Sequence, residues 1–160
     1  MKIRILFVCL GNICRSPAAE EIFRTLAARD SLSGRIACDS AGTYAGHAGE
    51  LPDRRMRRAA AARGYELTHR ARPLREADFD RFDRILVMDD YNYETVHRLA
   101  PSRDAARKIY RMTDFCRRSP QCSHVPDPYY EGREGFERVL DLLEDACEGL
   151  LDDLRTPSRS

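Results

Sequence analysis

The sequence predicts an α/β fold, in which a central four-stranded parallel sheet lies between helices on both faces of a single three-layer domain. Two observations support this prediction. Short apolar runs of strand length alternate along the chain with amphipathic segments of helical period. A length of 160 residues suits one domain with a sizeable core, and no repeat or linker divides the chain. We expect this domain to cover residues 1–155 and a polar tail to cover residues 156–160.

Four segments have the character of buried parallel strands. Ile3 to Val8 is almost continuously apolar, as expected for a strand covered on both faces. Shorter segments of the same kind follow at Ile36 to Ser40, Arg84 to Met88 and Lys108 to Met112. Parallel strands need right-handed crossover connections, which bring their carboxyl ends to one edge of the sheet.

The segments between these strands have helical spacing. Helices are expected from Pro17 onward, at Asp53 to Arg63, at Tyr91 to Leu99, and along the apolar stripe that runs from Phe136 to Leu154. Residues 113–131 contain three prolines and are expected to be irregular.

The bulk composition excludes several classes of function. The 27 Lys and Arg residues nearly balance the 26 Asp and Glu residues, and the net charge of +1 gives no argument for nucleic-acid or membrane binding. The first apolar stretch is too short for a signal peptide or a membrane span. We therefore expect a cytoplasmic protein whose six cysteines are mostly thiols.

The loop after the first strand carries the clearest chemistry. It starts at Cys9, contains Gly11 and Arg15, and leads into a helix with Pro17 in its first turn. A loop before a helix N-terminus offers several backbone N–H groups to an anion, and glycine lets it curl. Arg15 can donate a bidentate pair of hydrogen bonds to two phosphate oxygens, and the positive surroundings favour a nucleophilic thiolate at Cys9. Ser16 can donate a hydrogen bond to that sulfur.

A Cys-x5-Arg pattern alone is a weak signal, but its place between a buried strand and a helix strengthens it. Here the chain resembles the low-molecular-weight protein tyrosine phosphatases. The resemblance covers almost the whole chain in the family's order. It rests on five segments: Val8 to Pro17, Asp39 to Thr43, Thr68 to Arg72, Val87 to Asp89, and Asp127 to Tyr130.

The resemblance implies roles for the loop residues. Cys9 attacks the phosphoryl group and becomes a phosphocysteine, while Arg15 and the loop amides hold the oxygens. Asn12 braces the loop, with Ser40 and His69 as its partners. The resemblance further implies that Cys14 could form a reversible, protective disulfide with Cys9. The substrate-binding residues expected in the loop are Leu10, Gly11, Asn12, Ile13, Cys14 and Ser16.

A phenolate leaving group needs a proton donor opposite the nucleophile. Two carboxylates are candidates. Asp127 lies between two prolines, which stiffen its loop, and Asp89 lies at the end of a strand. The resemblance assigns the acid to Asp127, and we interpret Asp89 as structural. Tyr129 and Tyr130 are expected to form apolar walls that suit the ring of phosphotyrosine.

The resemblance weakens at the rim of the cleft. Many family members carry a large aromatic residue near the position of Gly46, and here either Tyr44 substitutes or the rim is open. The arginine cluster Arg54 to Arg58 could attract acidic substrates, although a solvated helix face is the simpler interpretation. The pattern Cys116-x5-Cys122-x-His124 matches no standard zinc spacing, so we expect no metal and no cofactor.

Three other functions are compatible with the loop. A thioredoxin-coupled arsenate reductase needs two further cysteines in a mobile segment, and residues 80–92 contain none. Protein-arginine phosphatases tend to carry threonine where Ile13 stands. A non-enzymatic phosphate-binding module would not need Cys9, Arg15 and Asp127 together. We therefore expect phosphotyrosine-containing proteins as substrates, no nucleic-acid or membrane partner, and a monomer or weak dimer.

Overall fold

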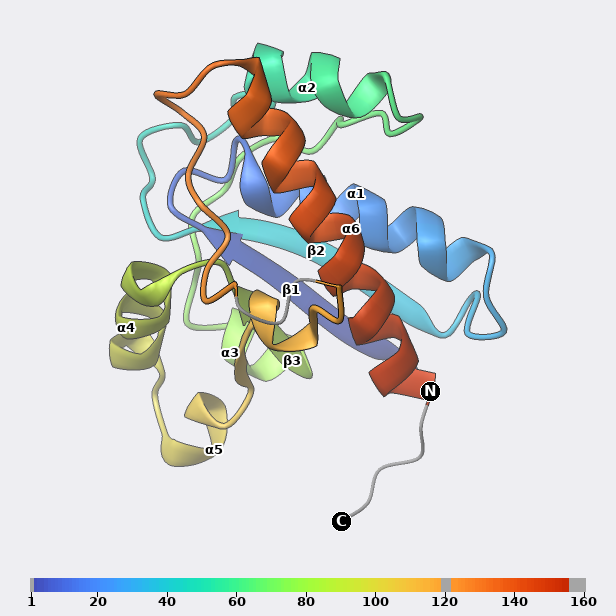
Figure 1. Ribbon diagram of the computed structural model, residues 1–160. Helices are drawn as coiled ribbons and strands as arrows, with labels where there is room; N and C mark the ends of the chain where they lie inside the picture. Colours follow the sequence, from blue (N-terminus) through green and yellow to red (C-terminus); the bar gives the residue numbers. More distant parts are fainter. Residues whose placement is uncertain (1, 119–121, 156–160) are drawn as a thin grey trace.

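The computed structural model describes residues 2–118 and 122–155, which form a four-stranded parallel sheet with helices around it (Figure 1). The strands are β1 (Ile3–Cys9), β2 (Ile36–Gly42), β3 (Arg84–Val87) and β4 (Ile109–Arg111). Their order is β2-β1-β3-β4, so β1 lies inside the sheet and pairs with both β2 and β3. The predicted parallel sheet is confirmed. The expected tail at 156–160 lies outside the described residues.

Helices cover both faces of the sheet. The chain contains α1 (Arg15–Ala28), α2 (Arg54–Ala61), α3 (Asp78–Arg81), α4 (Asp90–Leu99), α5 (Arg103–Ala106), the 3₁₀-helix η1 (Met112–Phe115) and α6 (Arg133–Arg155). In Figure 1, α1, α2 and α6 gather on one side of the sheet, and α3, α4 and α5 lie toward the other. None of the helices in the described ranges is long and apolar enough to cross a membrane.

The alternating side chains of β1 divide the interior into two cores. Ile5 and Phe7 point into the core shared with α1 and α6, and Phe7 meets Phe23 edge to face at a centroid distance of 5.7 Å. Leu6 and Val8 point into the opposite core, which contains Phe79 of α3. All four β1 side chains are fully buried. The predicted three-layer α/β architecture is therefore confirmed.

The structure differs from the sequence prediction in its shortest elements. The helices α3 and α5 were not predicted, because four residues are too few to display a helical period. The 3₁₀-helix η1 occupies part of the segment that was expected to be irregular. The strand β2 continues two residues beyond Ser40, to Gly42. Helix α2 begins one residue later than predicted, because Asp53 is its N-cap and accepts from Arg55 N at 2.8 Å.

Candidate active site

Cys9 and Arg15 mark the two ends of one tight loop. Cys9 is the last residue of β1, and Arg15 is the first residue of α1. Asn12 at the middle of the loop has a φ of 58°, a left-handed conformation that asparagine tolerates better than most residues. A Cβ on Gly42 would lie 2.7 Å from the carbonyl oxygen of Leu10. The end of β2 therefore has to be glycine for the loop to pack against it.

The side chain of Asn12 braces this loop from behind. Its Nδ2 donates to Ser16 Oγ at 2.7 Å and to Ser40 Oγ at 3.0 Å. Its Oδ1 lies 3.0 Å from His69 Nε2 and accepts from Arg72 N at 3.0 Å. All the hydrogen-bonding positions of the amide are thus used, which satisfies a side chain that is 1% exposed.

A layer of charged residues lies behind Asn12, and the sequence did not reveal it. Ser40 Oγ donates to Glu20 Oε1 at 2.6 Å, and His69 Nδ1 lies 3.4 Å from both Glu20 Oε1 and Asp39 Oδ1. Among the described residues, Glu20, Asp39 and His69 are a group whose atoms converge closely enough for a metal ion. Arg24 already pairs with Glu20 at 2.6 Å and Arg72 with Asp39 at 3.1 Å, so we interpret the group as a hydrogen-bond network.

Ser16 is oriented toward the sulfur of Cys9. Its Oγ lies 3.0 Å from Cys9 Sγ, and its backbone N–H points to the same sulfur at 3.4 Å. Because the Ser16 oxygen accepts from Asn12, its own hydrogen is free for the sulfur, and the alternative acceptor Ala41 O is farther away, at 3.4 Å. Two donors, the hydroxyl and the backbone N–H of Ser16, therefore converge on the Cys9 sulfur.

The guanidinium of Arg15 is buried and held in place. Its Nη1 donates to Asp89 Oδ2 at 2.7 Å and to Val125 O at 2.9 Å, and only 2% of Arg15 is exposed. Burial alone would lower the pKa of Arg15, but Cys9, Asp89 and Asp127 together raise it. Arg15 thus stays charged beside the sulfur. Asp89 also caps α4 by accepting from Asn92 N at 2.8 Å, so it serves as a structural anchor.

Asp127 approaches the same guanidinium from a distant segment. Its Oδ2 lies 3.7 Å from Arg15 Nη2, and its Oδ1 accepts from Tyr129 N at 3.1 Å. The side chain is 44% exposed, so a substrate can reach it. Asp127 and the loop enclose a cavity of about 220 Å³. The residues that line this cavity are Cys9, Leu10, Gly11, Ile13, Cys14, Arg15, Tyr44, His47, Asp127, Tyr129 and Tyr130.

Aromatic rings form part of the cavity lining. Tyr129 and Tyr130 meet edge to face with their centroids 5.0 Å apart, and Tyr130 is 95% exposed. Tyr44 and His47, which also line the cavity, meet edge to face with their centroids 5.9 Å apart. A Cβ on Gly46 would lie 2.1 Å from atoms of the Tyr44 ring. Of the two expected alternatives for the rim, the structure thus shows Tyr44 occupying the space beside Gly46.

The comparison with known proteins agrees with this geometry. The family model of the low molecular weight phosphotyrosine protein phosphatases matches residues 4–159. A low molecular weight protein-tyrosine-phosphatase from Streptomyces coelicolor is 42% identical over 157 residues, which cover 97% of this chain and 95% of the relative. The chain belongs to the low molecular weight phosphotyrosine protein phosphatase family. The predicted family and class of enzyme are confirmed.

Solved structures of phosphatases share the whole fold. A protein tyrosine phosphatase from Entamoeba histolytica, with Hepes in its active site, superposes with a TM-score of 0.93 at 45% identity, covering 96% of this chain and 97% of that one. YfkJ from Bacillus subtilis superposes with a TM-score of 0.89 at 40% identity and covers 97% and 96% of the two chains.

In this phosphatase the expected substrate-binding residues fall into two groups. Six of them line the cavity: Leu10, Gly11, Ile13, Cys14, Tyr129 and Tyr130. Asn12 and Ser16 are at most 1% exposed and lie behind the loop, where their side chains bond to protein groups. Sequence reasoning missed Gly42, Glu20 and Arg72, because only the folded chain brings Gly42 and Arg72 to Asn12 and Glu20 to Ser40.

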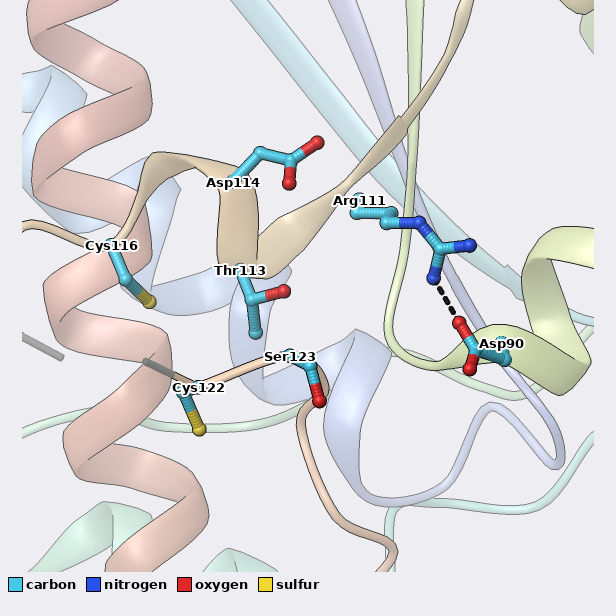
Figure 2. A pocket seen from close by; sticks show the side chains of 7 residues that line it. All are labelled: Asp90, Arg111, Thr113, Asp114, Cys116, Cys122 and Ser123. Carbon is cyan, nitrogen blue, oxygen red and sulfur yellow. Dashed lines mark hydrogen bonds and ion pairs between the residues drawn. The ribbon is translucent and has the colours of Figure 1, made fainter. Parts of the chain in front are cut away.

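All six cysteines of the phosphatase lie in described residues and are free. Cys14 lines the cavity beside Cys9, and burial, together with Asp53, raises its pKa. Cys116 and Cys122 line a different cavity of about 440 Å³, beyond the ends of β3 and β4 (Figure 2). Their sulfurs approach separate carbonyl oxygens: Cys116 that of Leu142 at 3.8 Å, and Cys122 that of His124 at 3.4 Å.

Proposed function

We propose that this phosphatase hydrolyses phosphotyrosine in proteins, and small aryl phosphates, through a phosphocysteine intermediate on Cys9. The observation that carries the proposal is the convergence of Cys9 and Arg15, from one loop, with Asp127, from a distant segment, on one cavity of about 220 Å³. A nucleophile, a phosphate clamp and a proton donor are the three groups that this reaction needs.

In the first step the Cys9 thiolate attacks phosphorus, a sulfur–phosphorus bond forms, and the bond from phosphorus to the phenol oxygen breaks. Asp127 gives its proton to that oxygen, so tyrosine leaves as a neutral phenol. Arg15 and the loop amides hold the other phosphate oxygens, whose negative charge they stabilise in the transition state. Asp89 and Val125 O fix the guanidinium, so it does not have to be ordered during the reaction.

In the second step a water molecule attacks the phosphocysteine. Asp127, now a carboxylate, accepts a proton from the water, and the sulfur–phosphorus bond breaks to release inorganic phosphate. Ser16 Oγ, at 3.0 Å from Cys9 Sγ, donates to the departing thiolate and stabilises it. The enzyme returns to its starting state with Asp127 protonated and Cys9 as the thiolate.

The cavity walls favour an aryl phosphate. Tyr44 and Tyr129 both line the cavity and provide flat apolar surfaces for a phenyl ring. Ile13, which is 8% exposed, adds apolar surface beside the loop. A short phosphoserine side chain would neither reach Cys9 nor use these walls. We further propose that the enzyme is cytoplasmic, in keeping with its free thiols, and acts as a monomer or weak dimer.

The proposal predicts hydrolysis of 4-nitrophenyl phosphate and of a phosphotyrosine peptide in the presence of a metal chelator. Cys9→Ser should abolish turnover, and Asp127→Ala should reduce it severely. Cys122, which is half-buried and lies outside the catalytic cavity, is replaced by Ser as the matched control and should keep full activity. A phosphoarginine peptide of the same sequence tests the substrate class, and faster hydrolysis of that peptide would contradict the proposal.

A further inference from the structure

Helix α2 concentrates positive charge beside the active site. Four of its eight residues are arginines, and it contains no acidic residue. Its N-cap Asp53 donates its backbone N–H to Ile13 O at 2.7 Å, which ties the start of the helix to the phosphate-binding loop. In Figure 1 the start of α2 lies next to the loop that precedes α6.

Two of these arginines are engaged within the protein. Arg55 hydrogen bonds to Asp53 and lies over the Tyr129 ring at 5.3 Å from the centroid. Arg57 donates to Pro52 O at 2.9 Å. Arg55 therefore supports a wall of the cavity, and Arg57 holds the turn before the helix.

The other two, Arg54 and Arg58, are free to bind a partner. The buried residues Met56, Ala59 and Ala60 fix the rotation of α2, so Arg54 and Arg58 project from the outer face. Both are exposed, and neither has a hydrogen-bond or ion-pair partner among the described residues. Four residues apart on a helix, their side chains are neighbours.

The acidic residues nearby do not neutralise this charge. Glu50 lies 3.1 Å from His47 and Asp53 pairs with Arg55 at 3.0 Å, so these two carboxylates are directed to residues other than Arg54 and Arg58. Arg70 adds a further exposed guanidinium next to the rim loop, where it donates to the Gly49 carbonyl at 2.9 Å. The surface beside the mouth is therefore positive, although the whole chain carries a net charge of only +1.

We propose that Arg54 and Arg58 form a docking surface for acidic residues close to the phosphotyrosine of a protein substrate. An extended peptide advances about 3.3 Å per residue, so carboxylates two positions apart match side chains on neighbouring helical turns. This inference rests on the proposed function, because the phosphotyrosine fixes the peptide at the cavity. A small aryl phosphate has no acidic residue to place against Arg54 and Arg58, so its hydrolysis should not depend on these two side chains.

The test compares two phosphotyrosine peptides. One carries Glu and Asp around the phosphotyrosine, and the other carries Gln and Asn at the same positions. For the wild-type enzyme at low salt we expect kcat/KM to be about fivefold higher for the acidic peptide, the range of two exposed ion pairs. The preference should vanish at about 1 M salt, where the screening length is about 3 Å.

Charge reversal by Arg54→Glu with Arg58→Glu should remove or invert the preference and leave hydrolysis of 4-nitrophenyl phosphate unchanged. The neutral double variant Arg54→Gln with Arg58→Gln should remove the preference for the acidic peptide but should not reverse it. Arg103→Glu at the start of α5 with Arg107→Glu at its C-cap changes the net charge equally at an exposed site far from α2 and should retain the preference.

Equal kcat/KM values for the two peptides in the wild-type enzyme, with normal hydrolysis of 4-nitrophenyl phosphate, would overturn the docking surface alone. Loss of the preference in the α5 control would also overturn it, because a general charge effect would then explain the result. An inactive wild-type enzyme would instead contradict the proposed catalytic function on which the docking surface rests.

Discussion

Asn12 donates from Nδ2 to Ser40 Oγ at 3.0 Å, and this bond ties the centre of the phosphate-binding loop to the end of the neighbouring strand. Asn12 adopts a φ of 58°, which costs free energy for a residue with a Cβ. The hydrogen bonds of its amide offset that cost and hold the loop curled around the anion site before a substrate binds. The loop is thus preorganised for the phosphate that we propose it binds.

Ser40→Ala should weaken both the loop and the fold. It removes an acceptor from Asn12 and a donor from Glu20, and we expect a loss of about 1–3 kcal/mol in the free energy of unfolding. A loop that is less well ordered should also lower kcat/KM by about tenfold or more. Urea unfolding and 4-nitrophenyl phosphate kinetics measure the two effects. The exposed Ser33→Ala is the control, and an equal response of both variants would contradict the bracing role.

Asp127→Asn and Asp89→Asn should respond differently to the leaving group. If Asp127 protonates the phenol oxygen, its replacement should slow the hydrolysis of phenyl phosphate at least about tenfold more than that of 4-nitrophenyl phosphate. The 4-nitrophenolate anion leaves more easily without a proton. Asp89→Asn disturbs Arg15 and should slow both substrates by the same factor. Steady-state kinetics with a series of substituted phenyl phosphates make this comparison. If the rate of Asp89→Asn depended more strongly on the leaving group than that of Asp127→Asn, Asp89 would be the proton donor and the assignment would be wrong.

Gly46→Ala should displace the Tyr44 ring, because the new Cβ would occupy the position of that ring. Tyr44 is 55% exposed, so the fold should lose little stability, whereas the KM for phosphotyrosine should rise about threefold as the aromatic wall is lost. Tyr44→Ala should have the same effect, and the double variant should add nothing further. Gly132→Ala is the matched control, since a Cβ there meets no atom within 4 Å. Additive effects would show that Gly46 acts independently of Tyr44.

The raised pKa of the Cys116 thiol implies that the folded protein loses stability at high pH. Burial and Asp145 raise its pKa to about 12, so the folded protein keeps a proton that the unfolded chain releases near pH 8.5. The unfolded state then binds fewer protons, and the free energy of unfolding falls as pH rises above that value. Between pH 8 and 10, the free energy of unfolding of Cys116→Ala should fall by about 2 kcal/mol less than that of the wild type. Urea unfolding under reducing conditions measures this, and parallel pH curves would contradict it.

The sequence predicted the elements whose pattern is local. The apolar run of β1 and the long stripe of α6 are visible in neighbouring residues, and the loop from Cys9 to Arg15 is continuous in the chain. The helices α3 and α5 were missed because each has only four residues.

The parts of the site that could not be predicted depend on contacts between distant segments. Glu20 resembles any acidic residue of an amphipathic helix, and only the folded chain places it 2.6 Å from Ser40 Oγ. The position of Tyr44 beside Gly46 likewise depends on the path of the loop after β2. The resemblance to a family supplied Asp127, for which the spacing of residues alone left Asp89 as an alternative.

The central claim is that the phosphoryl group passes through Cys9. Rapid acid quenching of the enzyme during turnover of a phosphotyrosine peptide, followed by proteolysis and mass spectrometry, locates any covalent phosphate. We expect one phosphoryl group on the peptide that contains Cys9, and none in Cys9→Ser. Phosphate on another residue, or sustained turnover by Cys9→Ser, would contradict this account.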